Sequence, residues 1–367
     1  MSHGEEPSVP RGTAILYEGL PGAFVTAAVE LPEPAEGERL VRILGATICG
    51  SDLHTWTGRR GAATPTVLGH EMVGEVVAVG PACAALDARG RDVGVGSRIT
   101  WGVVASCGDC PPCRDGWPQK CRRAVKYGHE QASGRKLLTG GLASHCLLAA
   151  GTTVVALDES LPLAVACPAS CATATAHGAV AACGGLTGRV VGVAGCGLLG
   201  LTATALAATA GARVIAVEPD SDRRRRAADF GAVVTVAPDG FAAAAAAAAP
   251  DGLDAFIEAS GSNAAFASGL AALRVGGTLV VVGAVSPAPP VAVSLEAIVR
   301  RCITIRGIHN YRPADLVAAV RFLEERHTVY PFAALVSAWY PLAEAAAAFH
   351  AADGPRHVRV GLLPPRE

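Results

Sequence analysis

The sequence predicts an α/β protein of two domains, one rich in β-strands and one built on a doubly wound parallel sheet. The chain has 367 residues, which is more than one hydrophobic core usually organises, so two domains are expected. Residues 1–172 are punctuated by glycine and proline, as is typical of short strands and turns. Residues 173–308 alternate β-branched runs with alanine-rich segments, which indicates strands joined by helices.

The second domain is expected to begin with a strand at 189–194, an apolar helix and a second strand at 213–218. Further β-branched runs at 253–261 and 277–284 predict later strands of the same sheet. The alanine run at 242–249 predicts helix or loop. Residues 309–367 are expected to return to the β-rich domain, beginning with a helix from Pro313.

Composition excludes several classes of function. The formal net charge is −1 and only 17% of residues are charged, so no basic field would attract nucleic acid or anionic lipid. The first residues lack the basic and apolar regions of a secretory signal, and we expect a cytoplasmic protein. Residues 190–212 carry no charge, but their five glycines and three threonines favour a buried strand, turn and helix over a membrane span.

Four cysteines gather in one polar loop at about residues 105–125, namely Cys107, Cys110, Cys113 and Cys121. Twelve cysteines in a chain without an export signal favour metal binding over disulfides. Disulfide pairing is the alternative, but the first three cysteines are too close in sequence to pair without strain. Four thiolates complete a tetrahedral Zn²⁺ shell and leave no open position, so we predict a structural zinc site.

A second set of metal ligands is spread along the chain. Cys49 opens the stretch Cys-Gly-Ser-Asp-Leu-His, His70 lies in Gly-His-Glu, and Cys171 precedes Ala-Thr-Ala-Thr. Two cysteines and one histidine leave one zinc position open for water or substrate, which is typical of a catalytic site. Cys167 is the alternative to Cys171 as a ligand.

A glycine-rich turn predicts a dinucleotide site. Gly195, Gly197 and Gly200 follow a β-branched strand and open a helix, which is the context that the G-x-G-x-x-G fingerprint requires. The second strand ends at Glu218. Its carboxylate would accept hydrogen bonds from the hydroxyls of the adenosine ribose, and its negative charge would repel a 2′-phosphate. We therefore expect NAD(H) rather than NADP(H), although the four arginines from Arg223 to Arg226 complicate that choice.

The order of these motifs resembles that of the zinc-dependent medium-chain alcohol dehydrogenases, from about residue 13 to residue 363. The resemblance implies a GroES-like catalytic domain and a Rossmann domain that binds NAD(H), with one catalytic and one structural Zn²⁺ in each chain. It implies that Ser51 binds the substrate oxygen, that His54 relays the proton, that Asp52 orients His70, and that Glu71 lies beside the zinc. It further implies cofactor contacts from Leu199, Thr175, Ser260, Val282, Ala284, Ile308 and Arg359.

The substrate is the least defined expectation. Polar and aromatic residues occur in segments that reach the cleft in relatives: Trp56, Tyr127, His129, Glu130, His309, Asn310 and Tyr311. They favour a small polar alcohol or carbonyl, and the surrounding stretches resemble both a subgroup proposed to act in phosphonate metabolism and polyol or cyclitol dehydrogenases. The apolar edge at 280–285 predicts a homodimer or homotetramer. The alternatives are a zinc-stabilised NAD(H)-binding protein without turnover and a zinc-free reductase of the same superfamily.

Overall fold

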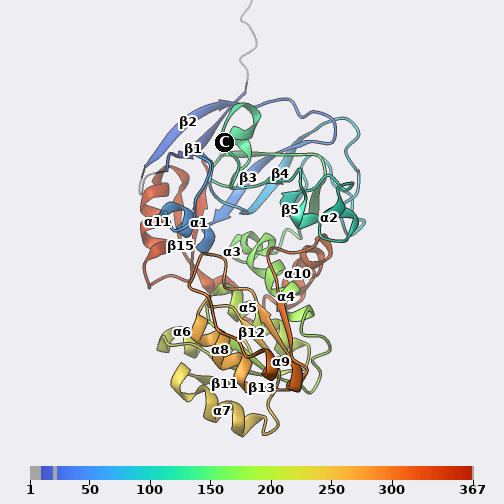
Figure 1. Cartoon of the computed structure of the whole chain (residues 1–367). Coiled ribbons are helices and arrows are strands. Elements are labelled where there is room, and N and C mark those ends of the chain that lie inside the picture. Colours follow the sequence, from blue (N-terminus) through green and yellow to red (C-terminus); the bar gives the residue numbers. More distant parts are fainter. Residues whose placement is uncertain (1–9, 20–22, 366–367) are drawn as a thin grey trace, which may run out of the picture. The chain divides into compact units, whose positions relative to one another are not determined.

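The computed structural model describes residues 10–19 and 23–365, and it divides the chain into two compact units. The first unit combines the N-terminal part up to Ser170 with the C-terminal part from Val336, and the second unit runs from Cys171 to Leu335. Figure 1 shows the elements of both units coloured along the sequence.

The first unit is rich in strands. Its elements are β1 (Arg11–Tyr17), β2 (Phe24–Glu30), β3 (Arg39–Thr47), α1 (Gly50–Trp56), β4 (Glu71–Val79), β5 (Arg98–Ala105), α2 (Pro111–Arg114), β6 (Val125–Lys126), β7 (His145–Leu148), β8 (Thr152–Ala156), α3 (Leu163–Ala166), β15 (Val336–Pro341), α11 (Ala345–Asp353) and β16 (Arg359–Leu363). Strands β1 and β2 pair alone, and an eight-stranded sheet has the order β15-β16-β3-β4-β5-β6, with β7 on β3 and β8 on β5.

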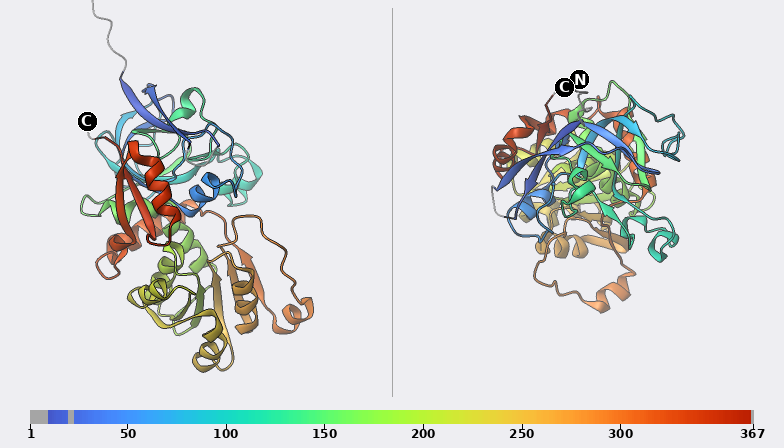
Figure 2. Two further views of the ribbon diagram at one scale, coloured as in Figure 1. Left: turned by 90° about the vertical axis from the view of Figure 1, so that its left-hand side faces the viewer. Right: turned by 90° about the horizontal axis from the view of Figure 1, so that it is seen from above.

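The C-terminal segment completes the core of this first unit. Strand β16 pairs antiparallel with β3, where Gly361 lies opposite Thr47. Phe349 of α11 is fully buried, and its ring centroid lies 5.0 Å from that of Phe24 and 5.8 Å from that of Trp56. Residues from both ends of the chain therefore share one hydrophobic core, and Figure 2 shows the red C-terminal elements beside the blue N-terminal ones.

The second unit has a six-stranded parallel sheet of order β11-β10-β9-β12-β13-β14. Its elements are α4 (Ala172–Ala181), β9 (Val190–Ala194), α5 (Leu198–Thr209), β10 (Arg213–Val217), α6 (Ser221–Asp229), β11 (Ala232–Val236), α7 (Phe241–Ala248), β12 (Leu253–Glu258), α8 (Asn263–Ala272), β13 (Leu273–Val281), α9 (Leu295–Arg301), β14 (Thr304–Gly307) and α10 (Pro313–Arg326). Strand β9, Val-Val-Gly-Val-Ala, is buried throughout, as expected of a central parallel strand. The strand order reverses direction at β9 and β12, which defines a topological switch point.

The segment 309–335 differs from the predicted division of the chain. It clusters with the second unit, whereas we expected it to return to the β-rich domain at residue 309. The physical reason is the packing of α10 against α4, where the Asp315 carboxylate lies 2.9 Å from Nδ1 of His177. The return occurs instead at Val336, where β15 begins.

The uncharged stretch 190–212 forms a strand, a turn and a short helix, as the sequence predicted. Among the residues that the structure describes, no single helix is long and apolar enough to cross a membrane. The pair Leu163–Ser170 and Ala172–Ala181 meets the length and composition test together, but it is bent by 58° and consists mostly of buried residues.

The strands β9, β12 and β13 are tied together by one carboxylate, and its loss should destabilise the second unit. Asp254 accepts hydrogen bonds from the Val190 N–H, Nη1 of Arg189 and Nε of Arg274, each at 2.8 Å. Asp254→Asn should lower the free energy of unfolding by about 1.5–3 kcal/mol at neutral pH. Denaturant titration measures this change.

The same carboxylate predicts the direction of a pH effect. Burial alone would raise the pKa of Asp254, but the bonds from Val190, Arg274 and Arg189 hold that pKa below its ordinary value. Its contribution is therefore present above the unfolded pKa of about 3.9 and is lost as pH falls through the lower folded pKa. The difference between wild type and Asp254→Asn should shrink in acid, and Asp239→Asn, at a local turn, is the control. A difference that grows in acid would contradict this assignment.

Candidate functional site

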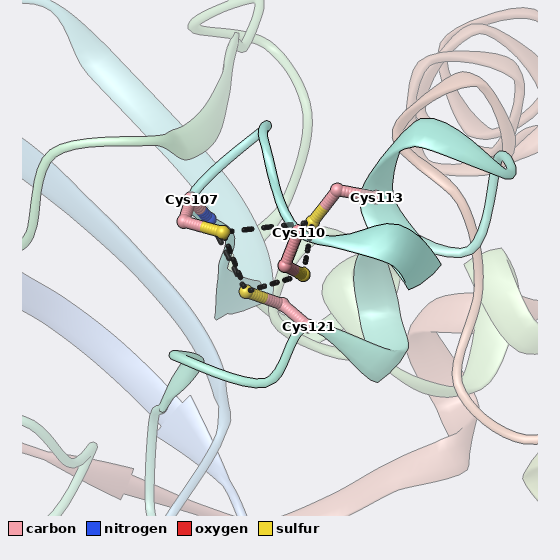
Figure 3. Close-up of side chains that lie close together, drawn as sticks. All are labelled: Cys107, Cys110, Cys113 and Cys121. Carbon is pink, nitrogen blue, oxygen red and sulfur yellow. Dashed lines mark hydrogen bonds between the residues drawn. The ribbon is translucent and has the colours of Figure 1, made fainter.

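The four-cysteine loop brings its sulfurs into a compact cluster. Sγ of Cys107 lies 3.4 Å from that of Cys121 and 4.0 Å from that of Cys113, while Cys110 lies 3.4 Å from Cys113 and 3.9 Å from Cys121. A tetrahedron with metal–sulfur distances of about 2.3 Å has edges of about 3.8 Å, so the donor set fits Zn²⁺. Figure 3 shows the four side chains turned toward a common centre.

Backbone N–H groups around this cluster favour the thiolate forms of Cys110 and Cys121. The Arg122 N–H points to Sγ of Cys110, and the N–H groups of Cys107 and Arg123 point to Sγ of Cys121. The Arg122 N–H lowers the pKa of Cys110 to about 6. All twelve cysteines lie in the described part of the chain and none forms a disulfide, which agrees with the metal interpretation.

The second set of ligands is positioned by a buried carboxylate. Cys49 is the N-cap of α1, and Asp52, in the first turn, accepts its N–H at 2.9 Å. The other oxygen of Asp52 accepts the Gly69 N–H at 3.2 Å and lies 3.2 Å from Nδ1 of His70. Asp52 is fully buried. One side chain therefore fixes both the Cys49 segment and the His70 segment.

Cys171 joins these two residues. The ligand atoms of Cys49, His70 and Cys171 lie within 4.8 Å of one another, and Cys171 directly follows Ser170, whose hydroxyl donates to the His70 carbonyl. Cys167 is not in this group and is fully buried, with its sulfur beside Gly45. The donor set of two sulfurs and one imidazole fits a zinc ion with one open position.

The carboxylate of Glu71 is bound on several sides. It accepts a bond from Oγ1 of Thr47 at 2.7 Å, and Arg359 donates to it from Nε at 3.0 Å and from Nη2 at 2.8 Å. Burial raises the pKa of Glu71 to about 7, although the Arg359 charge opposes that rise. Nη2 of Arg359 also lies 3.5 Å from Sγ of Cys49. The predicted contact between Arg359 and the pyrophosphate stays a prediction.

Two polar side chains of α1 lie close to the same site. Oγ of Ser51 is 3.2 Å from Nε2 of His70. His54 follows three residues later, and its Nδ1 is buried without a hydrogen-bond partner among the described residues. Burial, followed by the Arg59 charge, lowers the pKa of His54, so its ring is neutral at neutral pH and can accept a proton.

Of the residues predicted to line the cleft, His129 contacts one of the predicted metal ligands. Its ring centroid is 5.2 Å from that of His70, and the close approach of Gly128 to Gly69 explains the contact. Gly128 has a φ of +76°, and a Cβ there would meet the Gly69 oxygen at 2.6 Å. Only glycine fits such a position without strain.

Other predicted cleft residues have structural partners. Tyr127 is fully buried and its hydroxyl lies 2.6 Å from Oγ1 of Thr152. Glu130 accepts from the Lys126 N–H and from Nζ of Lys136. Trp56 packs on Phe349 in the core. These three side chains therefore serve packing and loop structure in their own unit.

The glycine-rich turn has the geometry of a phosphate-binding loop. Gly195 has a φ of +93°, and a Cβ on Gly200 would meet the Gly195 oxygen at 1.7 Å. Gly197 is the N-cap of α5, and a Cβ there would have nothing within 4 Å. The backbone is therefore open at the helix N-terminus, where the N–H groups favour a pyrophosphate.

Buried carboxylates lie at the carboxyl ends of β10 and β12, the two strands on either side of β9. Oε2 of Glu218, after β10, accepts the Cys196 N–H at 2.7 Å. Oε1 of Glu258, at the end of β12, accepts the N–H and hydroxyl of Ser260 and the Gly261 N–H. The remaining predicted cofactor residues vary in exposure: Thr175 and Val282 are buried, Leu199 and Ile308 are partly buried, and Ala284 is exposed.

Comparison with known proteins identifies the family. Residues 35–159 match the family model of the alcohol dehydrogenase GroES-like domain, and residues 199–325 match that of the zinc-binding dehydrogenases. A sorbitol dehydrogenase of Halalkalibacterium halodurans is 30% identical over 92% of this chain and 95% of its own length. The chain belongs to the zinc-binding alcohol dehydrogenases.

Solved structures agree with this family. An alcohol dehydrogenase from Thermotoga maritima is 29% identical and superposes with a TM-score of 0.90 over 97% of this chain and all of that one. A protein of Sinorhizobium meliloti, described as a zinc-binding dehydrogenase bound to NADP, is 26% identical with a TM-score of 0.84, over 97% of this chain and 100% of that one. The predicted GroES-like and Rossmann folds are thus confirmed, and this dehydrogenase is an oxidoreductase that acts on an alcohol or a carbonyl.

Sequence reasoning missed two features of the dehydrogenase. The Glu71–Arg359 pair joins residues 288 positions apart, so no local pattern indicates it. The second feature is Glu258, at the carboxyl end of β12, which lies next to β9. Its position near the end of a predicted strand was the only sequence signal that could have indicated its role in binding the following turn.

The four-cysteine cluster predicts a metal-dependent contribution to stability. Cys110→Ser should remove one zinc per chain and lower the Tm by on the order of 10 °C, because a serine hydroxyl replaces a thiolate ligand. Metal analysis and calorimetry measure both effects. The exposed Cys302→Ser is the control, and an unchanged zinc content in Cys110→Ser would contradict the site.

Proposed function

We propose that this dehydrogenase transfers hydride between NAD(H) and a small polar alcohol or carbonyl, of the polyol, cyclitol or phosphono-aldehyde type. The observation that carries the proposal is the group of Cys49, His70 and Cys171, with ligand atoms within 4.8 Å of one another and Ser51 beside it. Three protein ligands leave a fourth position open, which is what a catalytic zinc requires. The sorbitol dehydrogenase among the relatives supports a polyol.

The residues of the chain supply positioning and proton transfer. When bound, zinc supplies Lewis-acid polarisation of the substrate oxygen, and the nicotinamide supplies or accepts the hydride. Asp52 holds His70 and Cys49 in place through its two oxygens. Ser51 Oγ accepts the proton of the substrate hydroxyl, and the neutral ring of His54, on the same helix, receives it next.

The preference for NAD(H) is supported by Glu218. Its carboxylate stands after the second strand of the fingerprint and is held against the glycine turn by the Cys196 N–H. A carboxylate there accepts the ribose hydroxyls and repels a 2′-phosphate. Two of the four neighbouring arginines already have partners, since Arg224 is bound to the Glu218 and Pro219 carbonyls and Arg225 is paired with Asp222.

The stretch 280–285 does not form the predicted edge of the sheet, because β13 lies between β12 and β14, and Val280 and Val282 are buried. The exposed edge strand is β14, and it supports a homodimer or a homotetramer built from dimers. Strand β14 lies at the end of the strand order, and all four of its residues are exposed. Leu295 and Val299 of the adjacent α9 are 75% and 74% exposed. Such an edge favours pairing with the same strand of a second copy about a two-fold axis.

Cys49→Ser tests the catalytic zinc. The variant should hold one zinc where wild type holds two, and kcat/KM for any alcohol that wild type oxidises should fall at least about 10³-fold, because the polarising ion is lost. Metal analysis and NADH formation measure the two effects. Cys83→Ser, whose sulfur donates to the Glu38 carbonyl, should keep both zincs; equal zinc in Cys49→Ser and wild type would overturn the proposal.

Glu218→Gln tests the choice of cofactor. Loss of the negative charge should lower kcat/KM for NADH about 10-fold and raise it for NADPH, because repulsion of the 2′-phosphate disappears. Parallel assays with the two cofactors measure the ratio. Asp229→Asn, which removes one negative charge at the C-terminal end of α6, should leave the ratio unchanged, whereas wild-type preference for NADPH would contradict the assignment.

A further inference from the structure

The turn that follows β12 is bound by the side chain of the last residue of that strand. Oε1 of Glu258 accepts the Ser260 N–H at 2.7 Å, the Ser260 hydroxyl at 2.6 Å and the Gly261 N–H at 2.8 Å. Glu258 is 1% exposed, whereas Ser260 is exposed. A buried carboxylate oxygen that receives three donors from two consecutive residues leaves this turn little freedom to move.

This turn packs directly against the glycine-rich turn after β9. The Ala259 N–H donates to the Ala194 carbonyl, at the end of β9, at 2.9 Å. A Cβ on Gly195 would lie 3.0 Å from the Cα and the N of Ser260. Ser260 therefore lies at the carboxyl ends of the parallel strands, beside the loop that has the geometry of a phosphate-binding turn.

The strand order assigns the Ser260 turn to one half of a dinucleotide site. The order β11-β10-β9-β12-β13-β14 consists of two halves that meet at β9 and β12, and in such sheets each half binds one mononucleotide. Glu218, after β10, belongs to the half that is proposed to bind the adenosine ribose. Ser260 follows β12 and belongs to the other half, where the nicotinamide and its ribose would bind.

The hydrogen bonds of Ser260 fix the polarity of its hydroxyl group. A serine hydroxyl has one proton to donate and two lone pairs that can accept. The proton is directed to Glu258, and one lone pair accepts the Ser262 N–H at 3.1 Å. In the described part of the chain no other donor bonds this oxygen. The hydroxyl of Ser260 can therefore accept one more hydrogen bond, and it has no proton left to donate to a phosphate oxygen.

We propose that Glu258 makes Ser260 a hydrogen-bond acceptor for a ribose hydroxyl in the nicotinamide half of the dinucleotide. A ribose hydroxyl can donate to the remaining lone pair, whereas an ionised phosphate oxygen only accepts. Glu258 acts through Ser260, so it is a positioning residue for the cofactor. This inference rests on the proposed function, because it requires NAD(H) in the second unit.

Fragments of the cofactor test which part Ser260 binds. Calorimetric titration with ADP-ribose and with ADP compares ligands that contain and lack the second ribose. Ser260→Ala should weaken the binding of ADP-ribose about 3- to 10-fold and that of ADP by less than about 2-fold, because one hydrogen bond is lost. Ser268→Ala, which removes an exposed hydroxyl from α8, should change neither. Equal weakening of both ligands, or weakening of NADH without weakening of ADP-ribose, would overturn the contact with the ribose.

A double-mutant cycle tests whether Glu258 acts through Ser260. Glu258→Gln keeps an acceptor oxygen in a side chain of the same shape but removes the charge that orients the Ser260 proton, so ADP-ribose should bind about 3- to 10-fold more weakly. In the background of Ser260→Ala the same change should cost less than about 2-fold. Unchanged affinity for ADP shows that each variant has kept its fold. Equal losses with and without the Ser260 hydroxyl would overturn the role of Glu258.

Steady-state kinetics separate this inference from the proposed function. Ser260→Ala should raise the KM for NADH and leave the KM for the carbonyl substrate and the zinc content unchanged. Turnover with NADH by wild type, together with equal affinities of wild type and Ser260→Ala for ADP-ribose, would reject this inference alone. Binding of ADP-ribose without turnover of any alcohol or carbonyl, with two zincs bound, would reject the proposed function, and the fragment titrations would still decide the role of Ser260.

Discussion

The buried carboxylate of Asp52 is the constraint on which the proposed catalytic centre depends. It accepts the N–H of Cys49, accepts the N–H of Gly69 and faces the ring of His70. It caps a helix and at the same time fixes two predicted metal ligands that are 21 positions apart in sequence. Burying a carboxylate without such partners would cost free energy of folding. The hydrogen bonds that stabilise Asp52 in the fold are therefore the same ones that set the geometry of the site.

Local sequence patterns were sufficient to predict much of this architecture. The glycine fingerprint between two β-branched runs predicted β9, α5 and β10, because each requirement of that turn is expressed within consecutive residues. The clustering of the four cysteines was equally predictable, since they lie in one short loop and nearby backbone N–H groups donate to their sulfurs. Such features depend little on the rest of the fold.

Features that depend on distant partners were not predictable in this way. Arg359 was expected at the pyrophosphate from resemblance, and its two bonds to Glu71 required knowledge that β16 pairs with β3. The affiliation of residues 309–335 was missed for a similar reason, because the contact of Asp315 with His177 depends on the packing of α10 against α4. Tyr127 was expected to line the substrate cleft, but its hydroxyl forms a hydrogen bond with Thr152 within a buried core.

The discontinuity of the first unit has a consequence for the order in which the protein matures on the ribosome. The second unit consists of consecutive residues, 171–335, and all of them have been synthesised before β16 and α11 exist. The core that holds Ile15, Trp56 and Met72 also includes Phe349 and Val360, so it closes only when the last part of the chain has emerged. The second unit can therefore fold first during translation. The first unit, which carries Cys49 and His70, can fold completely only after the C-terminal residues have been synthesised.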